Sequence, residues 1–355
     1  MENLIVWLTR TVIFGSVIMY GAIGETLTEK AGNLNLGTPG IMCIGAAFGF
    51  SGAYLYQTNT DNPNAVVIII IGLGCAFLAS FIAGALYSLL TTTLRVNQNI
   101  TGLTLTIFGV GLSKFVGTFI IPEGSTSTKA DFANEVFSFK IFGALSKGFG
   151  QVFFSYGFMM YLVIIIAIAA TLFLNKTKAG LNLRAIGESP ATADAAGINV
   201  TKYKYLATCI GSGITGLGGV YYVLDYNYGT WATAAGDAIE ALAWLSVALV
   251  IFATWKPINL IWGSYIFGFC YWAYNYVPSV LGWNINSFIA QMLPYVVTII
   301  VLIIGSMRKK KENQARHRSV CHTSERKDNL CIMMLKKFLF PRMNSGRLMR
   351  DSVNR

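Results

Sequence analysis

Residues 176–205 read KTKAGLNLRAIGESPATADAAGINVTKYKY, a polar island between two apolar segments that are each long enough to cross a bilayer. The island contains only two acidic residues against five basic ones, which are Lys176, Lys178, Arg184, Lys202 and Lys204. Lysine and arginine are enriched in the cytoplasmic loops of membrane proteins. This bias therefore predicts that the island lies on the cytoplasmic side.

The island also contains the start and stop signals of a short helix. Ser189 is a good N-cap, Pro190 suits the first helical position, and Gly197 suits the residue just past the end. The residues between them, ATADAA, are mostly alanine. A connector between membrane helices does not need a capped, alanine-rich helix, so we interpret it as a docking surface for a soluble partner.

The composition predicts an all-α polytopic membrane protein. Of the 355 residues, 54% are hydrophobic and 12% are charged, whereas soluble domains carry about 25% charged residues. Nine candidate spans follow from apolar stretches of sufficient length. They are 4–23, 38–56, 65–90, 99–121, 155–174, 205–224, 239–254, 257–277 and 286–306.

The chain divides by charge into a transmembrane domain, 1–307, and a basic tail, 308–355. The tail holds 14 Lys/Arg and 4 Asp/Glu, so it carries nearly all of the net charge of +11. It has no helical or strand period, and we expect a disordered cytoplasmic extension attracted to anionic lipid. Binding of nucleic acid by the tail is the less favoured alternative.

Nine spans and a cytoplasmic island fix the side of every connector. The predicted cytoplasmic connectors are 24–37, 91–98, 175–204 and 255–256, and they hold eight basic residues. The predicted external ones, 57–64, 122–154, 225–238 and 278–285, hold three. This bias predicts an external N-terminus and a cytoplasmic tail. The second half of 122–154 is compatible with two structures, an amphipathic helix on the outer surface or a partly buried loop.

The connector 24–41, GETLTEKAGNLNLGTPGI, is too apolar for a free loop and contains several helix-breaking glycines. Non-helical backbone near a membrane is tolerated where it is buried in protein or lines a cavity. We therefore expect a broken helix near a transport pathway, with Glu25, Asn33, Asn35 and Gly37 as candidate pathway residues. An ordinary cytoplasmic turn is the alternative.

The sequence lacks the motifs that are typical of several classes of enzyme. The sequence has no phosphate-binding loop for nucleotide hydrolysis, no nucleophile elbow and no HExxH metal motif, and its two histidines lie in the tail. We therefore expect neither an enzyme nor a metal site, and no cofactor in this chain.

Lys114 and Arg10 fall inside spans, where we expect snorkelling or structural pairing. Asp225, Asp237 and Glu240 are expected to be solvated or to interact with Lys114 or a delivery protein.

Aromatic residues are dense in 262–283, WGSYIFGFCYWAYNYVPSVLGW. An interfacial aromatic belt explains them. The alternative is a stacking platform for a ring-shaped substrate.

Four segments in order resemble the inner-membrane permeases of ATP-binding-cassette (ABC) importers, in the group for ribose and simple sugars, nucleosides and branched-chain amino acids. They are GETLTEKAGNLNLGTPGIM (24–42), LNLRAIGESPATADAAGINVTKY (181–203), GSGITGLGGVYYVLDY (211–226) and LAWLSVALVIFATWKPINLIWGSYIFG (242–268). The resemblance implies a pathway between two permease subunits, a cytoplasmic ATPase that uses ATP, an external substrate-binding protein and a bacterial plasma-membrane location.

The resemblance also assigns residues. The stretch from Arg184 to Gly197 would form the coupling helix that sits in a groove of the ATPase, and Gly32 to Gly37 would lie at the helix break. The implied coupling residues are Arg184, Gly187, Glu188, Pro190, Ala193, Ala196 and Gly197. The implied function is a permease subunit for a nucleoside or simple-sugar-like solute. A stand-alone carrier or channel is the competing class, but coupling-ion or gating residues for it are hard to find.

Overall fold

The computed structural model describes residues 2–141 and 155–281, together with six isolated residues between 292 and 303. The predicted tail, 308–355, lies outside the described residues, as does most of the ninth predicted span, 286–306. The described part of residues 1–308 belongs to one compact unit.

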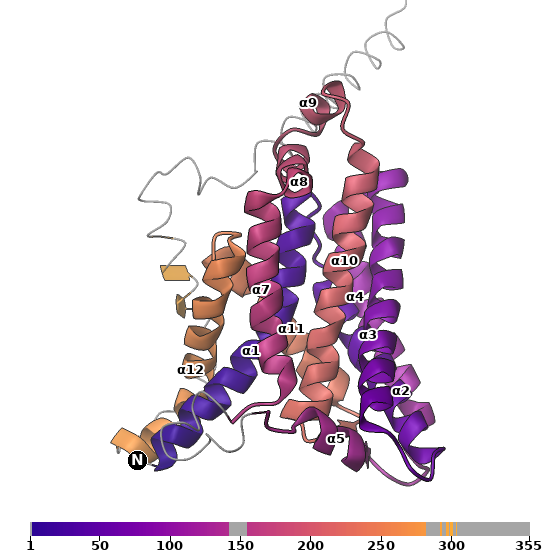
Figure 1. Ribbon diagram of the computed structural model, residues 1–355, viewed down its shortest axis with the longest axis vertical. Coiled ribbons are helices and arrows are strands. Elements are labelled where there is room, and N and C mark those ends of the chain that lie inside the picture. Colours follow the sequence, from indigo (N-terminus) through magenta and orange to yellow (C-terminus); the bar gives the residue numbers. More distant parts are fainter. Residues whose placement is uncertain are drawn as a thin grey trace, which may run out of the picture. The chain divides into compact units, whose positions relative to one another are not determined.

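The described chain is almost entirely helical (Figure 1). The long helices are α1 (Glu2–Lys30), α2 (Thr38–Thr58), α3 (Ala65–Ser88), α4 (Gln98–Ile120), α7 (Phe158–Lys176), α10 (Val200–Tyr221), α11 (Ala235–Phe252) and α12 (Pro257–Leu281). Two π-helical turns, η1 (Leu89–Thr93) and η4 (Tyr222–Tyr226), extend α3 and α10. The short elements are α5 (Asp131–Phe137), α8 (Lys178–Glu188), α9 (Pro190–Ala195), β1 (Ser127–Lys129) and β2 (Thr230–Ala232).

The predicted fold class, an all-α polytopic membrane protein, is confirmed. Among the described residues, seven helices are long and apolar enough to cross a membrane. They match the first seven predicted spans, and α12 contains the eighth at 257–277. The predicted count of nine is not established.

The predicted end of the first span is wrong. The sequence predicts a span over 4–23 and a connector over 24–37, whereas α1 continues to Lys30 and the connector is only 31–37. The polar residues that suggested an early end are satisfied by partners inside the protein. Glu25, for example, is 1% exposed and accepts a hydrogen bond from the backbone N–H of Asn35 at 3.2 Å.

Helix α10 lies at the centre of the bundle. In its best membrane-spanning window 83% of residues are buried, against 22% in the window of α3. Small residues allow its close contacts: a Cβ added to Gly24 would lie 2.2 Å from the carbonyl oxygen of Gly211, and one added to Gly45 would lie 2.3 Å from the Cα of Gly216. Packing rather than hydrophobicity drives helix association in a membrane. The glycines therefore hold α1 and α2 against α10.

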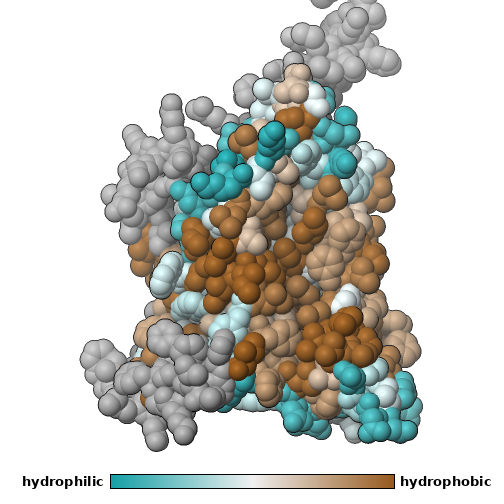
Figure 2. All heavy atoms as spheres, viewed as in Figure 1, coloured by the Kyte–Doolittle hydropathy of each residue, from teal (hydrophilic) through white to brown (hydrophobic). Residues whose placement is uncertain are grey.

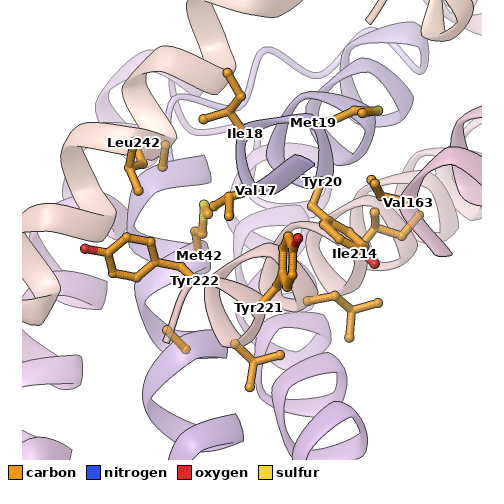
Figure 3. Packing of buried hydrophobic residues seen from close by; sticks show 14 of the residues in the cluster. Val17, Ile18, Met19, Tyr20, Met42, Val163, Ile214, Tyr221, Tyr222 and Leu242 are labelled. Carbon is orange, nitrogen blue, oxygen red and sulfur yellow. The ribbon is translucent and has the colours of Figure 1, made fainter. Parts of the chain in front are cut away.

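Larger side chains fill the remainder of this core (Figure 3). Tyr20 of α1 and Tyr221 of α10 meet edge to face, with ring centroids 6.0 Å apart. The hydroxyl of Tyr20 donates to the carbonyl of Met159 at 2.9 Å, which ties α1 to α7.

The connectors gather at two opposite ends of the bundle. At one end lie α8 and α9, and at the other lies α5 (Figure 1). The strand β1 directly precedes α5 in the chain. It pairs antiparallel with β2, with Thr128 opposite Trp231, so the two longest predicted external connectors meet. Figure 2 shows a hydrophobic surface across the middle of the face in view and hydrophilic residues toward its ends. The second half of the connector 122–154, from residue 142, lies outside the described residues.

Candidate functional site

The helix predicted in the polar island is α9, and its capping signals are confirmed. The Ser189 side chain accepts a hydrogen bond from the Thr192 N–H, and Pro190 is the first helical residue. At the other end Gly197 has φ +79° and donates to the Asp194 carbonyl at 2.9 Å, while the Ile198 N–H reaches the Ala193 carbonyl at 3.1 Å. These two bonds form a Schellman motif, which ends a helix at a glycine. Local sequence therefore defines both ends of α9.

A second helix in the island, α8, is missed by the sequence reasoning. The Thr177 side chain caps it by accepting from the Gly180 N–H at 3.0 Å. Leu183 and Ile186, three positions apart, are buried. A threonine N-cap followed by apolar residues at helical spacing was the available signal.

Burial divides the predicted coupling residues into two groups. Gly187 and Ala193 are buried within this chain, and Arg184 and Pro190 are half-buried. Glu188, Ala196 and Gly197 are exposed. On α9 itself, Ala191 and Ala195 are also exposed. The exposed surface of α9 consists of Ala191, Thr192, Asp194 and Ala195, followed by the C-cap Ala196. We name its three alanines, Ala191, Ala195 and Ala196, the alanine patch.

The connector 31–37 is a buried helix break, not a free turn. Asn33 and Asn35 are 1% and 2% exposed. The Asn33 amide donates to the Thr208 hydroxyl at 3.0 Å, and the Asn35 side chain accepts from the Gly37 N–H at 3.0 Å. Buried backbone without regular structure needs hydrogen-bond partners, and these amides supply some of them.

Four helices hold this break in place. Glu25 of α1 accepts from the Thr38 hydroxyl and the Asn35 N–H. The Tyr87 hydroxyl of α3 donates to the Leu34 carbonyl at 2.5 Å. From α4, the Thr106 hydroxyl donates to the Leu36 carbonyl at 2.8 Å, and the Gln98 side chain accepts from the Leu34 N–H at 2.9 Å. From α10, the Thr208 hydroxyl accepts from the Asn33 amide.

The island and the helix break touch through two glycines. Gly32 has φ +84°, and a Cβ added there would lie 3.2 Å from the Cα of Gly187. Gly187 ends the buried face of α8, one turn before α9 begins. Nearby, the Trp255 indole donates to the Glu29 carboxylate. Two segments that are far apart in sequence therefore form one continuous site at this end of the bundle.

Charged residues occupy one outward face of the bundle at the opposite end. The Lys114 ammonium of α4 lies 2.7 Å from the Asp237 carboxylate of α11, with side chains 46% and 59% exposed. Pairing of Lys114 was one of the predicted alternatives, and it is confirmed. Glu240 is also on α11 and accepts from the Trp244 indole at 3.4 Å. Charges are costly against lipid. This face of α11 is therefore suited to water or to another subunit.

Arg10 is paired as well. Its guanidinium lies over the ring of Tyr228, 5.2 Å from the centroid, and donates to the hydroxyl of that residue.

Among the described residues no group of histidines, cysteines and carboxylates could hold a metal ion.

Comparison of the sequence with known proteins identifies a family of transport proteins. Residues 7–304 match the family described as branched-chain amino acid transport system / permease component. The chain belongs to this family.

Several relatives are named as permeases of ABC transporters. A putative glucose ABC transporter permease of Haloferax volcanii is 31% identical over 264 residues, which are 74% of each chain. A nucleoside ABC transporter permease of Lactococcus lactis is 30% identical over 82% of this chain and 89% of the relative. A guanosine ABC transporter permease of Bacillus subtilis is 27% identical over 85% of this chain and 93% of the relative. No solved structure matches the chain.

Proposed function

We propose that this chain forms the translocation pathway of an ABC importer for a nucleoside or simple-sugar-like solute. The observation that carries the proposal is the contact between Gly187 of the island and Gly32 of the helix break. A partner that moves α9 would displace the break through this contact. The break is hydrogen-bonded to four spanning helices, so the displacement would reach the membrane domain.

The proposed partners occupy three surfaces. A cytoplasmic ATPase, which uses the ATP, docks on the alanine patch. A second permease subunit, identical or different, faces the outward side of α11, where Asp237 and Glu240 would be costly against lipid. A substrate-binding protein delivers the solute at the end that holds β1 and β2. The Arg184–Gly197 segment is the proposed coupling segment, and Glu25, Asn33, Asn35 and Gly37 are proposed to control the pathway by holding the break.

A neutral solute fits the charge of the membrane domain. The first 307 residues are nearly neutral, with 13 Lys/Arg and 12 Asp/Glu. Lys114 is paired with Asp237, so this cation is neutralised within the chain. The names of the relatives, which include nucleoside, guanosine and glucose permeases, support the same class.

The function is tested by uptake into membrane vesicles that contain the chain, with and without its ATPase and binding protein. We expect accumulation of a radiolabelled nucleoside or sugar only when ATP and the ATPase are present. Unlabelled nucleosides or simple sugars should compete, and peptides or metal ions should not. Accumulation without the ATPase would instead favour a stand-alone carrier.

The proposed orientation places the N-terminus outside and the end with α8 and α9 in the cytoplasm of a plasma membrane. Its support is the excess of basic residues in the island. Single cysteines at Asn62 and Val96, in a background without the six native cysteines, lie in exposed connectors at opposite ends. A membrane-impermeant thiol reagent added to intact cells should label Asn62→Cys and spare Val96→Cys. The reverse pattern would invert the orientation.

A further inference from the structure

A cavity of about 230 Å³ lies between α1, η4, α11 and α12, in the half of the bundle that holds β1 and β2. One wall is aromatic and consists of Phe14, Tyr222, Tyr226 and Tyr271. The facing wall is aliphatic and comes from α11, where it includes Ala238 and Ala241. The cavity is distinct from the helix break and the island.

The aromatic wall consists of two stacked pairs. The rings of Phe14 and Tyr271 are 4.2 Å apart between centroids and 16° from parallel. The rings of Tyr222 and Tyr226 are 5.3 Å apart and 26° from parallel. In Figure 3, Tyr222 points away from its neighbour Tyr221, to the side on which Leu242 lies. Tyr221, the last residue of α10, thus faces the core, and Tyr222, the first residue of the π-helical turn η4, faces the cavity. Such turns occur frequently at functional sites.

The side chains that line the cavity favour a flat ring that can stack. Every described side chain that lines the cavity is an aromatic ring, an alanine or a leucine. A sugar needs many hydrogen bonds, since each unpaired hydroxyl loses its contact with water. A nucleobase has two apolar faces, and every base stacks on aromatic side chains. The volume is below the roughly 300–1,000 Å³ of pockets for drug-sized ligands, so one ring system fills it.

The cavity opens on the charged side of α11. Ala238 and Ala241 are exposed, and Ala238 follows Asp237, whose carboxylate pairs with Lys114. Because a membrane face that bears these charges is suited to water rather than lipid, a solute could reach the cavity from the pathway.

We propose that this cavity binds the base of a nucleoside by stacking during transport. The inference rests on the proposed function and narrows its substrate class from nucleoside or sugar to nucleoside. Tyr222 and its stacked neighbours supply the binding surface, and Ala241 leaves room for the base.

A binding measurement tests the site without transport. A single cysteine replacing Ala238 is placed in the cysteine-free permease in lipid nanodiscs, and its rate of thiol labelling is measured. Guanosine and uridine should slow the labelling at least threefold, and glucose should not. Asn62→Cys, in the exposed connector between α2 and α3, is the control and should be labelled at the same rate throughout. Equal protection by glucose, or no protection by either nucleoside, would overturn the proposal.

Transport variants provide the second test, in the complete transporter. Ala241→Leu fills the cavity from an exposed position, and Tyr222→Leu removes a ring that Tyr222→Phe keeps. We expect the first two to raise the half-saturating nucleoside concentration about tenfold, which corresponds to about 1.4 kcal/mol. Tyr222→Phe and the control Ala169→Leu, on an exposed face of α7, should stay near wild type. Unchanged nucleoside uptake by Ala241→Leu would refute the proposed binding site. ATP-dependent uptake of sugar but not of nucleoside would refute a nucleobase as the ligand, and the proposed importer function would still hold.

Discussion

Replacing both Ala195 and Ala196 with arginine should abolish ATP-driven uptake and leave the permease folded in the membrane. Both residues are exposed in the alanine patch, so the new side chains do not enter the core. Arginine at the end of α9 is also compatible with the helix dipole. The large charged groups would keep a closely fitting ATPase groove away from the helix. Uptake should fall to the level measured without the ATPase.

Membrane amount and copurification of the ATPase are the accompanying measurements. The ATPase should no longer copurify with the double variant, although the quantity of permease in the membrane is unchanged. Val96→Arg is the matched control, because it adds the same side chain at an exposed position in a different connector at the same end. Wild-type uptake by Ala195→Arg/Ala196→Arg would remove α9 as the docking element. Ala193 is unsuitable for this test, because at 4% exposure its replacement would disturb the fold.

Gly32→Ala should uncouple ATP hydrolysis from transport. The residue is in the left-handed region, where a Cβ costs about 1–2 kcal/mol. The added methyl group would also press on the Cα of Gly187 at 3.2 Å, in the contact between island and break. We expect the ATPase to remain bound and to hydrolyse ATP, while uptake falls at least tenfold. The measurement is the ratio of solute transported to ATP hydrolysed in proteoliposomes.

Gly124→Ala separates the contact from the backbone strain. Gly124 has φ +81°, close to the +84° of Gly32, but a Cβ there meets nothing within 4 Å. It should keep the wild-type ratio of transport to hydrolysis. If both variants lowered the ratio equally, general strain would explain the result and the Gly32–Gly187 contact would have no role in coupling.

The two predictions test successive steps of one path. The alanine patch receives the ATPase, and the contact of Gly187 with Gly32 passes its movement to the helix break. From there Glu25, through its bonds to Asn35 and Thr38, leads to α1 and α2. Loss of ATPase binding in the first variant and retention of it in the second would distinguish docking from transmission.

Features that depend on a few neighbouring residues can be predicted from the sequence. Ser189, Pro190 and Gly197 predict the ends of α9 because capping acts within one turn of a helix. The first seven spans follow from length and hydropathy, since each must match the thickness of a bilayer. The end of the first span is the exception: Glu25 appears too polar for a spanning helix until its partners are known.

Which of these residues are in contact depends on the tertiary structure. It buries Ala193 and leaves Ala196 exposed, it places Gly187 against Gly32, and it brings Phe14, Tyr222 and Tyr271 around one cavity. These contacts join helices that are far apart in the chain, and they depend on how closely glycines such as Gly24 and Gly211 let the helices approach. The hydrophobic pattern of one helix selects the face that is buried. It does not specify which helix packs against that face, because in a membrane the partner is determined by how closely the two helices can pack.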